Sequence, residues 1–343
     1  MARCGFGRVN SPAAARALST PDPRGALAGA TIWCPDGMEL PMTIAARIAD
    51  LNGIITADDL AALGAQSEQV VVWLRQGHLV RARRGAYVDG PLWRSLDARN
   101  QERTAARAAV RRLTRVGGLV AAARTAAIIH ALPTIGQATT TILARTGGGP
   151  SEHAADVRIQ ACWGPGSAHE VDGVPVLAVA ASVISVAATS GVQAGVVAAD
   201  AALHQKRCSV DDLHDWMTPN IGRRGIRSAR ETIRLADPQC ESPGESLTRL
   251  GLVGLELPWR SQVEIATDAG TYRVDFLVGD RIVVEFDGAV KYGGAQGRDE
   301  LFKEKRREDA LRRAGFLVVR VTWADLRDPR RLQALLTPAL KAS

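Results

Sequence analysis

Two apolar runs on either side of a glycine turn constrain the C-terminal third of this chain more than any other feature. Within residues 271–292, an apolar set alternates with a set that contains the charged residues. Tyr272, Val274 and Phe276 alternate with Arg273, Asp275 and Leu277, and Ile282, Val284 and Phe286 alternate with Val283, Glu285 and Asp287. The turn at Gly279-Asp280 separates them. Alternation is typical of a β-strand, and two such runs joined by a tight turn predict a hairpin.

Three carboxylates lie inside this predicted hairpin. Side chains on a strand alternate between its two faces, so Glu285 and Asp287 share a face, and the adjacent strand can bring Asp275 beside them. Grouped carboxylates resist ionising together unless a cation lies between them, and hard oxygen ligands suit Mg²⁺ or Mn²⁺. The alternative is that they lie on the exposed face of an open sheet, paired with arginines.

The helix predicted after the hairpin, at about 298–314, also carries charge on its apolar face. Glu304 and Glu308 fall among the apolar anchors at about 100° per residue, and Lys305 flanks that stripe. We expect this face to overlook a polar site as well as a core.

The ordered motifs of this region resemble a known family. They are Asp275, Glu285-Phe286-Asp287-Gly288, Lys291-Tyr292 and the runs 304–311 and 315–320. These motifs are similar to the nuclease-like domain related to the very-short-patch repair endonuclease, in the PD-(D/E)XK superfamily. The resemblance covers about 242–340 and implies a restriction-endonuclease-like α/β/α domain with Mg²⁺-dependent endonuclease activity.

The resemblance also implies roles for individual residues. Asp275 and Glu285 would ligate Mg²⁺ (or Mn²⁺), with Asp287 as a further ligand or a group that orients water. The second acidic strand reads Glu-Phe-Asp where the superfamily has Glu-x-Lys. The catalytic lysine would therefore be Lys291 or Lys305, or be absent.

Ser242-Pro243-Gly244-Glu245 predicts the start of a helix. Ser242 at the N-cap, proline at the first helical position and Glu245 at the third form a capping box, which explains Glu245 structurally. The resemblance implies a second role, because an acidic residue of this first helix often joins the active site. Both alternatives stay open for Glu245.

Residues 42–90 predict three short helices followed by a basic hairpin, the pattern of a winged helix-turn-helix. Thr56 and Asp59 predict a capping box, and Ser67 is the expected N-cap of the third helix, with Val71 and Leu74 facing inward. The module resembles the N-terminal winged-helix domain of type IV toxin–antitoxin antitoxins of the AbiEi kind. The resemblance rests on Gly77-His78-Leu79 and on Arg84-Gly85-Ala86-Tyr87-Val88.

DNA is the partner that this module predicts. Arg81, Arg83 and Arg84 cluster on the short wing, where they can contact phosphates, and Gln69 and Arg75 of the third helix can contact base edges. A protein-interaction module is the alternative.

The remaining segments are chemically quiet. Residues 1–41 lack sustained periodicity and predict a disordered tail, or a start codon placed too far upstream. Residues 91–236 predict an α/β connector, which in resembling sequences belongs with the antitoxin-like half. Its apolar stretch 174–199 is broken by Pro175 and by glycines, and predicts a buried strand followed by helices rather than a membrane span.

Composition bears on partner and compartment. A net charge of +7 and an isoelectric point near 9.5 favour a polyanionic partner. Five scattered cysteines without CxxC spacing indicate neither a zinc site nor a disulfide framework, which favours a reducing cytoplasm.

The sequence therefore predicts an α+β or α/β multidomain chain with two alternative functions. One is a metal-dependent DNA endonuclease that the winged helix delivers to DNA. The other is a non-enzymatic DNA-binding regulator or type IV antitoxin with a degenerate nuclease domain. A regulator that binds a palindrome would be a homodimer, with or without a cognate toxin. RNA as substrate is a third possibility, although the winged helix favours duplex DNA.

Overall fold

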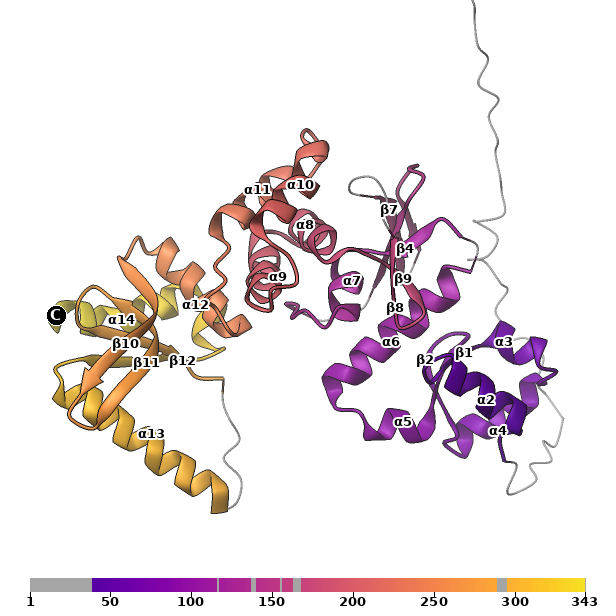
Figure 1. Ribbon diagram of the computed structural model, residues 1–343, viewed down its shortest axis with the longest axis horizontal. Helices are drawn as coiled ribbons and strands as arrows, with labels where there is room; N and C mark the ends of the chain where they lie inside the picture. The colour runs from indigo at the N-terminus through magenta and orange to yellow at the C-terminus, as the bar shows by residue number, and fades with distance from the viewer. Residues whose placement is uncertain are drawn as a thin grey trace, which may run out of the picture. The chain divides into compact units, whose positions relative to one another are not determined.

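The chain mixes helices with three sheets within the part that the computed structural model describes, which is 39–115, 117–136, 140–154, 156–162, 168–288 and 295–342 (Figure 1). It divides into two compact units. The first holds residues up to Ala121 together with 139–161 and 168–176, and the second holds the rest. The prediction of a mixed helix-and-sheet chain with several parts is confirmed at that level. The predicted tail up to residue 38 and the candidate Lys291 lie outside the described residues.

From residue 39, where the description starts, the first unit has three helices and a three-stranded sheet up to Asp89. In chain order these are α2 (Met42–Asp50), β1 (Ile54–Thr56), α3 (Ala57–Ala62), α4 (Ser67–Arg75), β2 (Leu79–Arg83) and β3 (Ala86–Asp89). The strand order is β1-β3-β2, with both pairs antiparallel. Ile44, Ile48 and Leu60 of the helices pack with Trp73 and Leu79 in one apolar core. We call residues 42–89 the N-terminal module.

Of the two helix N-caps predicted in this module, one is confirmed and one is wrong. The Thr56 capping box is confirmed, with the Asp59 N–H donating to the Thr56 hydroxyl at 3.2 Å and the Thr56 N–H donating back at 3.0 Å. The assignment of Ser67 as the next N-cap is wrong: Gln66 takes that place, and its N–H donates to the Gln69 side chain at 2.8 Å.

The inward face of α4 is also shifted from the prediction. Val71 is 38% exposed, whereas Val72 and Trp73 are buried and Leu74 is half-buried. The large indole of Trp73 gains the most from burial, so it sets the rotation of the helix and turns Val71 outward.

A second sheet of six strands completes the first unit. It is preceded by α5 (Gly90–Ser95) and α6 (Ala98–Leu113), and α6 packs against both sheets. Its strands are β4 (Leu119–Ala121), β5 (Thr141–Arg145), β6 (Glu152–Ala154), β7 (Val157–Ala161), β8 (Ala168–Val171) and β9 (Val174–Leu177), in the order β6-β7-β5-β4-β9-β8. Strands near 139–144 and at 157–161 were predicted, whereas β4 and β6 were not.

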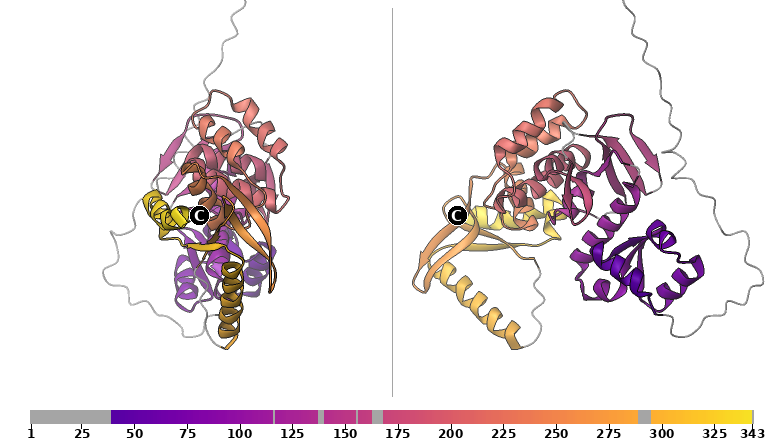
Figure 2. Two further views of the ribbon diagram at one scale, coloured as in Figure 1. Left: turned by 90° about the vertical axis from the view of Figure 1, so that its left-hand side faces the viewer. Right: turned by 45° about the vertical axis from the view of Figure 1, so that its right-hand side comes forward.

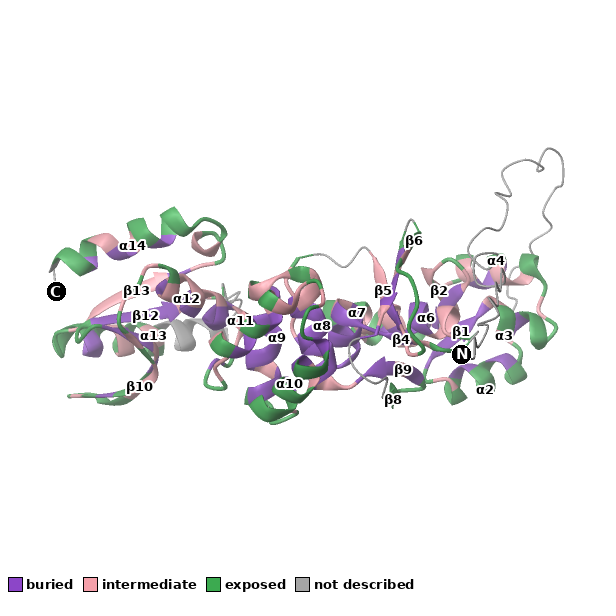
Figure 3. Ribbon diagram, turned by 90° about the horizontal axis from the view of Figure 1, so that it is seen from above, coloured by how far each residue is buried: buried purple, intermediate pink, exposed green. Residues whose placement is uncertain are grey.

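The second unit opens with a group of helices. These are α7 (Ala123–Ile129), α8 (Val179–Ser190), α9 (Val192–His204), α10 (Val210–Met217), the short η2 (Thr218–Asn220) and α11 (Ile226–Leu235). Figure 3 shows α8 and α9 largely buried, as expected for helices that are apolar on most sides. The prediction for 174–199 is confirmed, since this stretch forms β9 and then these two helices. No helix in the described ranges combines the length and apolarity that crossing a membrane requires.

The rest of the second unit, residues 243–342, is called here the C-terminal region. Its elements are α12 (Pro243–Gly254), β10 (Trp259–Thr267), β11 (Gly270–Val278), β12 (Ile282–Phe286), α13 (Ala295–Arg313), β13 (Leu317–Val321), η3 (Asp325–Arg327) and α14 (Pro329–Ala342). The strand order is β10-β11-β12-β13, antiparallel except for the parallel pair β12–β13. The predicted hairpin at 271–292 is thus present as β11 and β12.

Helices cover both faces of this sheet (Figures 1 and 2). On one face, Phe276 and Val284 pack with Leu252 of α12 and with Leu332 and Leu336 of α14. On the other face, Leu277 and Val283 pack with Leu311 of α13. The alternation of the strands, apolar toward both sides, is the pattern of a sheet buried between two helical layers.

Candidate functional site

A row of polar side chains crosses the C-terminal sheet. The register pairs Phe276 with Val284 and Leu277 with Val283, and continuing it places Asp275 opposite Glu285. Glu285 is paired in turn with Arg320 of β13. Residues opposite one another in neighbouring strands share a face, so these three side chains lie side by side on the face that α13 covers.

Asp275 is held by a backbone donor. The Phe286 N–H donates to Asp275 Oδ2 at 2.8 Å. Burial raises the pKa of the Asp275 carboxyl above its ordinary value; the Phe286 N–H opposes this rise, and the Glu285 charge adds to it.

Glu285 is paired with an arginine from α13. Its side chain is 11% exposed, and Arg307 Nη2 donates to its Oε1 at 2.5 Å and to the Arg273 carbonyl at 2.7 Å. Burial raises the pKa of the Glu285 carboxyl, Arg307 lowers it, and the neighbouring Glu304 raises it again. The net direction is upward, so even an arginine at contact distance does not fully offset burial and repulsion.

Two glutamates of α13 also form ion pairs. Glu304 and Glu308 each accept a hydrogen bond from Arg320 Nη2 at 2.9 Å. These ion pairs explain the charges on the predicted apolar face of the helix, because Glu304 and Glu308 contact Arg320 in the polar row of the sheet. Lys305, one of the candidate lysines, is exposed on α13.

Glu245, at the start of α12, extends the acidic group. Its N–H donates to the Ser242 hydroxyl at 3.2 Å, so the N-cap is as predicted. The reciprocal half of the predicted capping box is wrong, since the Glu245 carboxylate accepts from the Glu241 N–H at 2.9 Å and from the Gln262 side chain at 3.1 Å. Gln262 lies on the neighbouring β10, and drawing the carboxylate toward this strand places it within electrostatic reach of Asp275.

The pKa of the Glu245 carboxyl is also raised, first by burial and then in part by the Asp275 charge. Glu245, Asp275 and Glu285 therefore form a series in which each carboxylate destabilises the ionised form of the next. Such a series of acids with raised pKa values is typical of a functional site.

Two of these three carboxylates, Asp275 and Glu285, each use one oxygen in the hydrogen bonds formed among the residues that the structure describes. The other oxygens, Asp275 Oδ1 and Glu285 Oε2, accept none of these bonds, whereas Glu245 also interacts with the Ser242 side chain. Nevertheless, the described part of the chain holds no group of three Asp, Glu, His or Cys side chains arranged to bind an ion. Asp287, the third predicted ligand, is half-exposed, and its N–H donates to the Val321 carbonyl at 2.8 Å.

The candidate DNA-contacting residues of the N-terminal module differ in their exposure. Arg81 and Arg84 of the β2–β3 hairpin are exposed, as is Arg75 on α4. Arg83, in contrast, has only 14% of its side chain exposed. It forms an ion pair with Asp156 and donates to the Thr141 hydroxyl at 2.5 Å.

Arg83 and Gln69 are thus engaged within the protein. Burial lowers the pKa of Arg83, and Asp156 opposes that shift. Gln69 accepts the Gln66 N–H at the start of α4, so its side chain carbonyl caps that helix. Sequence reasoning missed Arg307 and Arg320 as parts of the acidic site; the only signal for them was their place among the glutamates of one helix face and on the next strand.

The chain has relatives among known proteins. It is 35% identical over 140 residues to an uncharacterized protein found in each of two strains of Mycobacterium tuberculosis, CDC 1551 / Oshkosh and H37Rv. The match covers 39% of this chain, and the chain spans about half the length of the curated relatives it matches, 50%. No family model matches the chain.

Proposed function

We propose that this protein is a DNA-binding, Mg²⁺- or Mn²⁺-dependent endonuclease of the cytoplasm. The observation that carries the proposal is the series Glu245, Asp275 and Glu285, in which burial and the charge of a neighbouring carboxylate raise each pKa, while Asp275 Oδ1 and Glu285 Oε2 accept no hydrogen bond from the described residues. A divalent cation would relieve the repulsion and use those oxygens.

The donor set fits a magnesium ion that two carboxylates hold. Asp275 and Glu285 adjoin the last cross-strand pair, Phe276 and Val284. Mg²⁺ typically binds one or two protein carboxylates and completes its shell with water and substrate phosphates. Such an ion supplies a water of lowered pKa and stabilises the charge that develops on the phosphate in hydrolysis. Asp287, at the end of the same strand, would serve as a further ligand or orient water.

The protein's own residues have distinct tasks in this proposal. The Phe286 N–H fixes the orientation of Asp275 by holding its Oδ2. Arg307 holds Glu285 in place while leaving its Oε2 available, and its guanidinium is suited to contact a phosphate of the bound strand. Lys305, exposed on the same helix, and Lys291, outside the described residues, remain the proposed catalytic lysines.

The order of elements supports the same proposal. A helix, an antiparallel meander of three strands, a second helix and a parallel fourth strand form the α/β/α arrangement that the sequence resemblance to the PD-(D/E)XK superfamily implies. In the N-terminal module, the proposed winged helix-turn-helix, α3 and α4 are followed by a hairpin on which Arg81 and Arg84 are exposed for phosphate contact.

Cleavage of supercoiled plasmid and of short DNA duplexes by the purified full chain tests the proposal. With Mg²⁺ or Mn²⁺ we expect nicking or cleavage, lost in Asp275→Asn and in Glu285→Gln. These variants keep the side-chain shape and remove a buried charge, so they should remain folded. Glu264→Gln is the matched control, since Glu264 is an exposed acid of β10 in the same sheet. Cleavage that survives in both site variants would refute the assignment of these carboxylates.

A second candidate has its own supporting observation. Arg307 already neutralises one oxygen of Glu285, and Asp287 stands where the superfamily pattern has lysine. These features favour a non-enzymatic DNA-binding regulator or type IV antitoxin, acting as a homodimer, with a cognate toxin or none. Sequence-specific DNA binding without metal-dependent cleavage, unaffected by Glu285→Gln, would select this candidate.

A further inference from the structure

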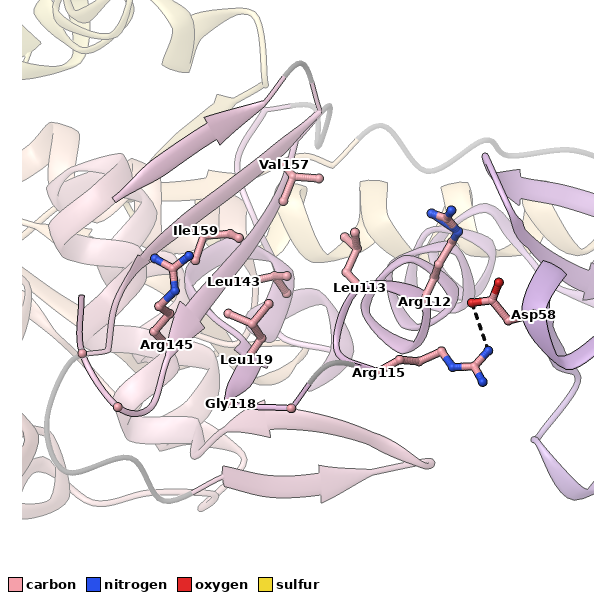
Figure 4. A pocket seen from close by; sticks show the side chains of 13 residues that line it. Asp58, Arg112, Leu113, Arg115, Gly118, Leu119, Leu143, Arg145, Val157 and Ile159 are labelled. Atoms are coloured by element: carbon pink, nitrogen blue, oxygen red, sulfur yellow. Dashed lines mark ion pairs between the residues drawn. The ribbon is translucent and has the colours of Figure 1, made fainter. Parts of the chain in front are cut away.

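The first unit contains a cavity that neither proposed function uses. Its volume is about 390 Å³, and it lies between the C-terminal end of α6, the strands β4, β5 and β7, and the start of α3 (Figure 4). Ligand pockets typically have volumes of about 300–1,000 Å³, so it is large enough for a small organic molecule.

The lining of this cavity has an apolar wall and a basic rim. Leu119, Leu143, Val157 and Ile159 from the strands lie across from Leu113 of α6, as Figure 4 shows. The lining also contains three arginines: Arg112 on α6, Arg115 just after that helix, and Arg145 on β5. An apolar wall with a few charged groups suits a ligand that has an apolar body and an acidic end.

Two of the three guanidinium groups are already neutralised. Arg115 forms an ion pair with Asp58 at 3.1 Å, drawn as a dashed line in Figure 4, and Arg145 pairs with Glu152 at 2.6 Å. Arg112 has no hydrogen bond or ion pair with any residue that the structure describes, and it lowers the pKa of Arg83 by adding positive charge nearby. The cavity therefore offers one uncompensated cation, which is the complement of a single negative charge.

The guanidinium of Arg112 packs against the backbone of Gly85. A Cβ on Gly85, at the turn of the β2–β3 hairpin, would lie 2.3 Å from Arg112 Nε, so the guanidinium packs against a surface that only glycine leaves open. Gly85 also has a φ of +71°, which favours glycine for a second reason. This packing restricts Arg112 before any ligand arrives, which reduces the entropy lost on binding.

We propose that this cavity binds a small monocarboxylate with an apolar body, its carboxylate on Arg112 and its body against the apolar wall. A polyphosphate does not fit the same lining, because it would find one uncompensated guanidinium and a wall of leucine, isoleucine and valine.

The test is a calorimetric titration of the full chain with decanoate. Decanol, which lacks the charge, and acetate, which lacks the long alkyl chain, are the comparison ligands. We expect saturable binding of decanoate at one site per chain, weaker binding of decanol and none of acetate. Arg112→Leu should weaken decanoate about tenfold, the loss of one charge-assisted hydrogen bond, and leave decanol unchanged. Arg112→Lys should recover part of the loss.

Two further variants distinguish the two ends of the ligand. Leu119→Gln, in the apolar wall, should weaken decanoate and decanol alike. Arg99→Leu, an exposed arginine on the same helix and outside the cavity, should change neither. The proposal is overturned if decanoate does not bind, if it binds at many sites, or if Arg112→Leu and Arg99→Leu have the same effect.

Discussion

Removing the guanidinium that holds Glu285 should destabilise the C-terminal region. In Arg307→Ala, a carboxylate with 11% of its side chain exposed loses the arginine that hydrogen-bonds to it. Arg320 remains as a nearby positive charge, while Asp275 and Glu304 still repel the carboxylate. Breaking a fully buried ion pair costs about 3–5 kcal/mol. Because 25% of the Arg307 side chain is exposed, solvent screens part of this interaction, and we expect a loss of about 2–3 kcal/mol.

A double-mutant cycle separates this charge effect from lost packing. Glu285→Gln removes the charge, so Arg307→Ala in that background should cost much less, giving a coupling energy of about 2 kcal/mol. The free energy of unfolding is measured by urea titration of the full chain, followed by tryptophan fluorescence and circular dichroism. Arg306→Ala, an exposed neighbour on α13, is the control. A coupling energy below about 0.5 kcal/mol would refute the view that Arg307 neutralises Glu285.

The same variants report on the proposed cation. If Mg²⁺ and Arg307 share the Glu285 carboxylate, millimolar Mg²⁺ should stabilise Arg307→Ala more than the unsubstituted chain, and Glu285→Gln least. Ligand binding to the native state stabilises it by RT ln(1 + [L]/Kd), so tighter binding gives a larger shift, and the order of the three shifts is the readout. Equal shifts in all three proteins would mean that the ion binds elsewhere.

Three further predictions concern other groups. Asp275→Asn should stabilise the chain by about 1 kcal/mol at pH 7 by removing repulsion between carboxylates. Because the native pKa of Asp275 is raised, this carboxyl destabilises the fold increasingly as the pH rises, so the gain measured by urea titration should shrink from pH 7 to pH 4. A gain independent of pH would contradict the charge argument. Arg81→Gln should weaken binding to all DNA sequences, and it should reduce the slope of log K against log[salt], measured by fluorescence anisotropy, by about 1. Arg83→Gln should leave this slope unchanged because Asp156 holds Arg83. Equal slopes for both variants would refute this assignment. Arg249→Ala should cost about 3 kcal/mol in urea unfolding by leaving the buried Asp200 carboxylate, 2.8 Å from Arg249 Nη2, without its charge partner, and a loss under about 1 kcal/mol would count against that pairing.

Features that depend on neighbours in sequence could be predicted well. Alternation placed the β11–β12 hairpin, and the spacing of Thr56 and Asp59 identified a capping box whose hydrogen bonds join residues three apart. The same alternation put Asp275 and Glu285 on one face, because side-chain direction along a strand follows from its two-residue period. Errors within this local range arose where two signals competed, as at Ser67 and Gln66, adjacent polar residues that can each begin a helix.

The partners of charged residues were decided by tertiary structure alone. The sequence identified Glu285 as a candidate ligand, but only the packing of α13 on the sheet brings Arg307, 22 positions later, to its carboxylate. Arg83 was predicted to contact DNA, and it pairs instead with Asp156, 73 positions away, because the second sheet lies beside the hairpin. Local periodicity determines the direction in which a side chain points. Its ion-pair partner depends on how elements distant in sequence pack together, and the spacing of neither residue encodes that contact.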